Sequence, residues 1–367
     1  MPKVALVHDW LNQMGGAEQV LEEMVGLYPE APVYTSIYWP EGVSSDYEGW
    51  EIRTTWLDRV PGVKRHHQLF FPLYPLAFES LDLDGYDVVL SNKSGFCHGV
   101  ITPPETVHVC YCLTPTRYVW RYHDYARREG IGRLARVALQ PILASLRMWD
   151  RLAADRVDCF VAISSEIQRR IKKYYRRDST VIYPPVETGR FAPAPTHDDY
   201  YLSVGRLVPY KRVDLAVQAC TQLGLPLKVA GKGRDQRRLE AMAGPTVEFL
   251  GYVPDDELGE LMAHCKAFLF PGAEDFGIAP IQAMAAGRPV IAYAYGGALD
   301  TVVQGQSGTL FREQSVRGLV EALESLNVER YDPARIRKHA EQYDASIFCK
   351  KIGEVVARAY EEHSTWS

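Results

Sequence analysis

Two cations follow one predicted strand of this 367-residue chain, and their side chains are suited to binding an anion. Arg206 lies in the loop after the apolar run 201–204, and Lys211 stands at the start of the next predicted helix. Because a cation at a helix N-terminus opposes the helix dipole, the pair makes more chemical sense with an anion between them. A planar guanidinium and a mobile ammonium together suit a diphosphate. The alternative is a solvated basic loop.

A carboxylate stands in a second strand-to-helix loop. Residues 268–270 are apolar enough to form a strand that is covered on both faces, and a helix is expected from about Gly277 to Ala286, ending at Gly287. A helix whose first amides project from a glycine loop at the end of a strand is a ready phosphate site. Glu274, just before this helix, is well placed to accept hydrogen bonds from sugar hydroxyls. The alternative is an ordinary loop with a solvated glutamate.

Further glycines stand at other strand-to-helix turns. They are Gly15 and Gly16 after the first strand, and Gly231, Gly233, Gly296 and Gly297 in the second half of the chain. Glycine lets a ligand or a facing domain approach the backbone, although many such turns carry glycine only for packing. All these loops belong at the carboxyl edge of a sheet, where open α/β folds bind ligands.

Strand and helix signals alternate along the chain, which indicates parallel sheets of the α/β class. The proline-rich stretch 184–199 is typical of a linker, so we expect two Rossmann-like, doubly wound domains that face each other across a cleft. The predicted domains are residues 1–187 and 188–345, and the predicted helix 346–367 returns to the first domain. Strands are expected at 4–7, 33–37, 88–90, 107–112, 159–163, 181–183, 201–204, 227–230, 247–250, 268–270 and 290–292.

The composition is that of an ordinary globular protein, with 47% hydrophobic residues, 24% charged residues and a formal net charge of −5. This balance argues against a nucleic-acid binder, which normally has a basic excess. No apolar run is long enough to span a membrane, and the N-terminus lacks the anatomy of a signal peptide. The seven cysteines show no zinc spacing. We expect a cytoplasmic protein.

The chain resembles the retaining family 4 glycosyltransferases, which have the GT-B architecture, in four segments: GGAE at 15–18, VGRLVPYKR at 204–212, EDFGIAPIQAMAAGRPVIA at 274–292 and GGALDTV at 296–302. The resemblance covers nearly the whole chain. It is strongest to the bacterial cell-surface polysaccharide branch, which includes O-antigen mannosyltransferases, and the segment CYCLTPTRYVW at 110–120 fits that branch as well.

The resemblance implies a transferase that uses a UDP- or GDP-linked sugar as co-substrate, without a metal or another cofactor. Arg206 and Lys211 are then expected to hold the diphosphate and stabilise the leaving group, in place of a metal ion, and Glu274 to bind the donor sugar. These three are the expected catalytic residues. The resemblance also implies that Tyr252 and Val253 lie near the nucleotide base, that the amides of Phe276, Gly277 and Ile278 face the donor, and that Gln282 stands at the ribose position. The turn glycines Gly15, Gly16, Gly231 and Gly233 are the remaining expected binding positions.

Two positions depart from the family pattern. The second of the family's paired glutamates is Gln282 here, which keeps an acceptor but loses the charge, so we expect altered nucleotide binding. Where relatives carry a histidine that contacts the donor sugar's 6-hydroxyl, this chain has Leu113. A buried hydroxyl without a partner costs about 1–3 kcal/mol, which suggests a donor without a 6-hydroxyl, a deoxyhexose or a pentose. His98, His108 and His123 are the nearby histidines that could compensate.

The acceptor is expected to be a glycan or a polyprenyl-linked glycan bound by the first domain. Basic and aromatic residues are mixed in 63–78, and arginines stand between apolar positions in 127–156, a combination that can mark a membrane-surface face. The resemblance implies peripheral attachment at the inner face of the cell membrane, because many relatives extend lipid-linked glycans there. The alternative is core aromatics with solvated arginines. Two other functions compete with transfer: a nucleotide-sugar-binding protein that has lost catalysis, for which Leu113 and Gln282 are the suggestive losses, and an epimerase or phosphorylase of the same architecture.

Overall fold

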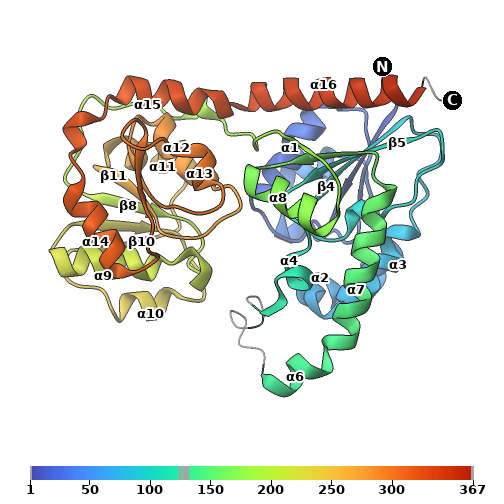
Figure 1. Ribbon diagram of the computed structural model, residues 1–367, viewed down its shortest axis with the longest axis horizontal. Helices are drawn as coiled ribbons and strands as arrows, with labels where there is room; N and C mark the ends of the chain where they lie inside the picture. The colour runs from blue at the N-terminus through green and yellow to red at the C-terminus, as the bar shows by residue number, and fades with distance from the viewer. Residues whose placement is uncertain (1, 124–125, 127–131, 365–367) are drawn as a thin grey trace. The chain divides into compact units, whose positions relative to one another are not determined.

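The computed structural model describes residues 2–123, 126 and 132–364. The chain divides into two compact units, one made of Met1–Pro185 together with Phe348–Ser367 and the other of Val186–Ile347. Each unit is built around its own parallel sheet, with helices in the connections between strands (Figure 1). The α/β class predicted from the alternating pattern is confirmed.

The first unit contains a seven-stranded parallel sheet in the order β3-β2-β1-β4-β5-β6-β7. β1, β4 and β5 are buried along their whole length, as expected for strands with helices on both faces of the sheet. The strand order reverses between β1 and β4, which makes this the switch point of the sheet. The strands are Val4–His8 (β1), Val33–Thr35 (β2), Ile52–Thr54 (β3), Val88–Lys93 (β4), Val107–Cys112 (β5), Cys159–Ala162 (β6) and Thr180–Val181 (β7).

Asp9 lies at the switch point of this first sheet and binds the loop after β4. It directly follows β1 and is fully buried. Its two carboxylate oxygens accept four backbone N–H groups of the loop after β4, those of Ser94, Gly95, Phe96 and Cys97, over 2.5–2.8 Å. A buried charge is tolerated only where it is fully hydrogen-bonded, and this one is. Asp9 therefore fixes the loop after β4 against the end of β1.

The second unit contains a six-stranded parallel sheet in the order β10-β9-β8-β11-β12-β13, with its switch point between β8 and β11. The apolar side chains of β9, β11 and β12 pack with helices α9 and α14 in one core. The strands are Tyr201–Val204 (β8), Leu227–Ala230 (β9), Val247–Gly251 (β10), Ala267–Phe270 (β11), Val290–Tyr293 (β12) and Gly308–Phe311 (β13).

Helices form most of the connections. Ser164 caps the helix Ser165–Tyr174, because its hydroxyl accepts a hydrogen bond from the backbone N–H of Ile167. The helices are Gly16–Leu27 (α1), Val63–His66 (α2), Tyr74–Glu79 (α3), Arg117–Trp120 (α4), Arg133–Ala138 (α6), Gln140–Ala153 (α7), Ser165–Tyr174 (α8), Val213–Leu223 (α9), Gln236–Glu240 (α10), Asp255–His264 (α11), Ile278–Ala285 (α12), Ala298–Thr301 (α13), Val316–Ser325 (α14), Pro333–Ala340 (α15) and Ala345–Ser364 (α16).

The proline-rich stretch 184–199 is not a free linker. The second unit begins at Val186, where the backbone bridges to Asp344, and Val186 and Phe191 are buried. Arg288 is also buried and donates hydrogen bonds to the carbonyls of Ala194 and Thr196. The prolines mark an irregular backbone, but side chains of the second unit hold that backbone in place.

The boundary between the two units falls within the first turn of helix α16. α16 starts at Ala345, and from Phe348 onward its residues are part of the first unit. Phe348 and Ile352 are buried there, and the Phe348 ring packs edge-on against Tyr111 of β5 at 5.3 Å. The C-terminal segment therefore supplies core side chains to the first unit.

Candidate functional site

Lys211 and Glu274 meet at the switch point of the second sheet. Lys211 ends the loop after β8 and Glu274 lies in the loop after β11, and these two strands are neighbours (Figure 1). The Lys211 Nζ lies 2.6 Å from the Glu274 Oε2, and the side chains are only 22% and 15% exposed. Crevices at switch points are where open α/β folds bind ligands. The sheet order therefore brings a cation and a carboxylate to that place.

One oxygen of this ion pair has no protein partner. The Glu274 Oε1 is buried and accepts no hydrogen bond within the described part of the chain. Buried polar atoms without a partner are rare in native proteins, and a ligand is one common explanation. A carboxylate only accepts hydrogen bonds, so the missing partner is a donor such as a hydroxyl.

Close backbone contacts hold these loops together. A Cβ atom on Gly231 would lie 2.0 Å from the Gly205 carbonyl oxygen, so the loop after β9 can touch the loop after β8 only with glycine there. A Cβ atom on Gly296 would meet the Glu274 carbonyl oxygen at 2.0 Å. The Gly297 N–H donates to that same carbonyl over 3.1 Å. The glycines at 231 and 296 thus serve loop packing, which positions Lys211 and Glu274.

Arg206 does not take part in the ion pair. Its side chain is exposed, and the guanidinium makes no hydrogen bond or ion pair with residues 2–123, 126 or 132–364. It follows β8 directly after Gly205, in the same loop as Lys211. The Arg206 guanidinium is therefore available to bind an anion.

Helix α12 begins beside Glu274, as the sequence predicted, but one residue later than expected. Gly277 precedes it with a φ of 96°, a conformation that favours glycine, and Ile278 is the first helical residue. Phe276 is buried, whereas Ile278 and Gln282 are half-buried. The helix N-terminus thus stands next to the ion pair, with Gln282 one turn further on.

The loops after β9 and β10 are joined by a hydrogen bond from the Gly231 N–H to the Gly251 carbonyl of 2.6 Å. Tyr252 follows, and its side chain is 70% exposed. Val253 is half-buried, and Gly233 packs with its Cα against the Leu207 carbonyl. An exposed aromatic ring at this edge of the sheet can stack on a flat heterocycle.

Three of the predicted contacts, Gly15, Gly16 and Leu113, belong to the first unit. Gly15 precedes α1, which starts at Gly16. Leu113 follows β5 and is half-buried, and its N–H donates to the Lys93 carbonyl over 2.8 Å.

Two of the three candidate histidines near Leu113 are core residues. His98 and His108 are fully buried, and burial lowers the pKa of His98 to about 4 and that of His108 to about 3. The His108 Nε2 is paired with the Ser91 hydroxyl, and the His98 Nε2 lies 3.2 Å from the Asp150 carbonyl. Neither ring can replace a hydroxyl-binding histidine at a site. His123 is exposed.

Two adjoining family descriptions match this chain. Residues 14–190 match the Glycosyltransferase Family 4 domain, and residues 187–343 match the Glycosyl transferases group 1 domain. The chain belongs to the GT-B glycosyltransferases of group 1 and family 4. The family predicted from the four motifs is therefore confirmed, and the Lys211–Glu274 pair lies in the group 1 domain.

Solved structures of glycosyltransferases share the fold. HepE of Anabaena, solved with UDP, has a TM-score of 0.73 at 18% identity and covers 97% of this chain and 100% of its own. WaaG, a glycosyltransferase involved in lipopolysaccharide biosynthesis, has a TM-score of 0.69 at 18% identity and covers 96% of this chain and 99% of its own. The GT-B fold is confirmed.

Curated relatives match part of the chain. An uncharacterised glycosyltransferase of Methanocaldococcus jannaschii is 26% identical over 226 residues, which cover 59% of this chain and 63% of the relative. A GDP-mannose-dependent phosphatidylinositol monomannoside mannosyltransferase of Mycobacterium tuberculosis is 30% identical over 212 residues, which cover 49% of this chain and 55% of the relative. The chain thus spans less than two thirds of each of these relatives.

No helix in the described part of the chain is both long enough and apolar enough to cross a membrane. The described residues also contain no group of three or more His, Cys, Asp or Glu side chains that could hold a metal ion.

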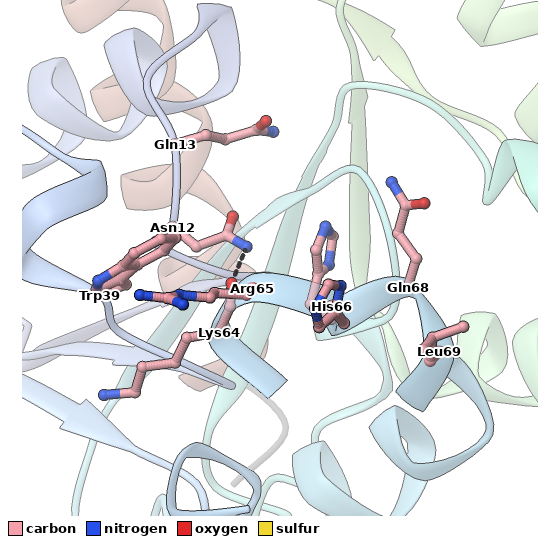
Figure 2. Close-up of a pocket in the computed structure, with 9 residues that line it drawn as sticks. Asn12, Gln13, Trp39, Lys64, Arg65, His66, Gln68 and Leu69 are labelled. Carbon is pink, nitrogen blue, oxygen red and sulfur yellow. Dashed lines mark hydrogen bonds between the residues drawn. The ribbon is translucent and has the colours of Figure 1, made fainter. Parts of the chain in front are cut away.

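The first unit contains a hollow that was not predicted from the sequence. It has a volume of about 420 Å³ and is shown in Figure 2. Residues 64–69, which line one side of it, had been noted only for their basic and aromatic character. The other side is formed by Asn12, Gln13 and Trp39, which carry no recognisable motif.

Proposed function

We propose that this protein is a retaining, metal-independent glycosyltransferase that moves a sugar from a UDP- or GDP-linked donor to a glycan or a lipid-linked glycan. The observation that carries the proposal is the Lys211–Glu274 pair at the switch point, with the Glu274 Oε1 buried and lacking a donor. Cell-surface polysaccharide synthesis is the setting we propose, because WaaG is involved in lipopolysaccharide biosynthesis and the mycobacterial relative is a phosphatidylinositol monomannoside mannosyltransferase.

In this proposal the two residues of the ion pair contact different parts of the donor. Lys211, with Arg206 beside it in the loop, neutralises the diphosphate as it leaves, which lowers the barrier most when negative charge develops there. Glu274 accepts hydrogen bonds from the sugar hydroxyls and orients the ring. Retention follows if the acceptor attacks from the face on which the diphosphate leaves, a route that needs no carboxylate nucleophile. The cations then supply the electrostatic stabilisation that a metal ion gives elsewhere.

The nucleotide is the first thing to determine. Thermal-shift assays with UDP, GDP, ADP and their sugars are expected to give a rise in melting temperature with one nucleotide, since a ligand that binds only the folded state stabilises it. Support for a nucleotide comes from HepE, which was solved with UDP and with UDP-glucose. If none of the nucleotides raises the melting temperature, the proposal is wrong.

The competing proposal is a nucleotide-sugar-binding protein without catalysis. It rests on Leu113 and Gln282, which replace a hydroxyl-binding histidine and a carboxylate of the family pattern. Such a protein shows the same thermal shift but releases no nucleotide when acceptor extracts are added. A coupled assay for free UDP or GDP therefore separates the two proposals.

We propose further that the donor sugar lacks a 6-hydroxyl, because Leu113 offers no hydrogen bond and the neighbouring His98 and His108 are buried in the core. The Leu113→His variant is expected to shift kcat/KM toward a 6-hydroxylated hexose by about 10–100-fold relative to the wild type, the equivalent of about 1–3 kcal/mol. The measurement compares nucleotide pentoses and deoxyhexoses with nucleotide hexoses. A wild-type preference for GDP-mannose or UDP-glucose would refute this part.

Peripheral attachment to the inner face of the cell membrane is also proposed. Large apolar side chains stand exposed beside basic ones in both segments noted from the sequence, Leu69 in the first and Leu134 and Val137 in the second. Residues 127–131 of the second segment lie outside the described residues. Cosedimentation with anionic vesicles is expected at low salt and is expected to weaken at high salt. Equal recovery with neutral vesicles would contradict the electrostatic part.

A further inference from the structure

The hollow in the first unit has the dimensions and the position of a ligand site. Its volume of about 420 Å³ is enough for a monosaccharide phosphate. Asn12 and Gln13 follow β1 and Trp39 follows β2, so these residues stand at the carboxyl edge of the first sheet. That edge is where open α/β folds bind ligands. The opposite wall is α2 and the turn after it (Figure 2).

The charge of this hollow is positive. Lys64 and Arg65 line it, and none of its lining residues is an acid. Lys64 is partly balanced by Asp58, at 3.3 Å. The Arg65 guanidinium lies over the Trp39 ring, 5.9 Å from its centroid, and makes no ion pair with any residue of the described ranges. One positive charge is therefore uncompensated and held by an aromatic face.

A neutral polar group of the hollow, the Asn12 side-chain amide, favours a ligand that carries hydroxyls. The Asn12 Nδ2 donates to the Lys64 carbonyl over 3.2 Å, which fixes the amide, while the Asn12 Oδ1 is buried and accepts no hydrogen bond from the described chain. Figure 2 shows the Gln13 side chain above the Asn12 amide. An amide oxygen seeks a donor such as a hydroxyl. The preferred ligand thus carries both a negative charge and hydroxyls.

We propose that this hollow binds a phosphoryl group of the acceptor, with Arg65 and Lys64 on the phosphate and Asn12 on a neighbouring hydroxyl. Guanidinium and ammonium groups are the usual phosphate binders in proteins. The proposal rests on the proposed function in one respect, since it names the substrate that receives the sugar. The phosphate is that of a soluble sugar phosphate or that of a lipid headgroup.

Calorimetric titration of the full chain tests whether the hollow binds phosphate. Saturating UDP is present so that Lys211 and Arg206 are occupied. The ligands are glucose 1-phosphate, dihexanoyl phosphatidic acid below its micelle concentration, and glucose. We expect at least one phosphate to bind tenfold or more tightly than glucose. Tight binding of glucose 1-phosphate identifies a soluble acceptor, and tight binding of the phosphatidic acid alone identifies a lipid headgroup.

The Lys64→Gln/Arg65→Gln variant is expected to lose this binding at least tenfold, and the single Arg65→Gln variant, at an exposed position, is expected to lose part of it. Lys173→Gln on α8, an exposed lysine outside the hollow, is the matched control and is expected to bind like the wild type. All variants must keep the wild-type melting temperature. Unchanged phosphate binding in the double variant, or binding of glucose as tight as that of both phosphates, overturns the proposal.

A failure of the proposed function is recognisable separately. If UDP and GDP do not bind, the same titration is carried out in the Arg206→Gln/Lys211→Met background, which removes the other phosphate-binding cations. If phosphate binding then depends on Lys64 and Arg65, the proposed phosphate site in the hollow is supported although the transferase proposal fails. If phosphate binding depends only on Arg206 and Lys211, the proposed phosphate site is wrong.

Discussion

Replacing Lys211 with methionine is expected to lower kcat/KM for the donor by about 100–1,000-fold, the range found when one preorganised charge-stabilising group is removed. The Lys211 Nζ is the cation in contact with Glu274, at 2.6 Å, and in our proposal it faces the departing diphosphate. Methionine has a similar length and no charge, so the shape of the side chain is largely kept. Steady-state kinetics with the nucleotide sugar found by thermal shift give the measurement.

Lys266→Met is the matched control for this variant. Lys266 is also paired with a carboxylate, with its Nζ 2.7 Å from the Asp199 Oδ1, but it stands before β11 and Glu274 follows that strand. Exposed ion pairs contribute little, so its activity is expected to stay within about twofold of the wild type. A Lys211→Met enzyme that retains full activity, or a Lys266→Met enzyme that loses as much, would remove the basis for the proposed role.

The second large effect concerns stability. The Asp9→Ala variant is expected to lose at least about 4 kcal/mol of unfolding free energy, because four backbone N–H groups at 94–97 lose a charged acceptor inside the protein. The Ser94 hydroxyl loses the same partner, at 3.1 Å. Urea unfolding gives the free energy, and native-state hydrogen exchange is expected to show loss of protection at the Phe96 and Cys97 amides.

Asp178→Ala serves as the control for the stability measurement. The Asp178 side chain is 91% exposed and, among the residues that the structure describes, pairs only with an exposed lysine, Lys172, at 2.6 Å. Its removal is expected to change the unfolding free energy by less than about 1 kcal/mol. If Asp9→Ala is no more destabilising than Asp178→Ala, the carboxylate does not hold the loop after β4 in the way its contacts indicate.

The buried strands were predictable because their apolar runs are short and bounded by turn residues. The predicted ranges 107–112, 201–204 and 227–230 coincide with β5, β8 and β9. Two strands were missed. β3, Ile52–Thr54, has mostly exposed side chains, and β13, Gly308–Phe311, begins with a glycine and a threonine. Such strands carry little hydrophobic pattern, and pairing with a neighbouring strand is what forms them.

The site was predictable only as far as the loops that carry it. The motif positions placed Arg206, Lys211 and Glu274 at the carboxyl edge of one sheet, and the structure brings Lys211 and Glu274 into contact while Arg206 stays outside the pair. The direction of a side chain on a loop depends on backbone contacts such as that of Gly296 with Glu274, which spacing does not reveal. The proline-rich stretch misled for the same reason, since composition does not show that Val186 and Phe191 are buried.

The helix α16 has a consequence for the order in which the chain matures. The second unit is continuous in sequence, from Val186 to Ile347, whereas the first unit needs Phe348 and Ile352 to complete its core. During translation we therefore expect the Tyr111 face of the first unit to stay uncovered until α16 has left the ribosome. The unit whose synthesis starts earlier is thus expected to complete its core later than the second unit.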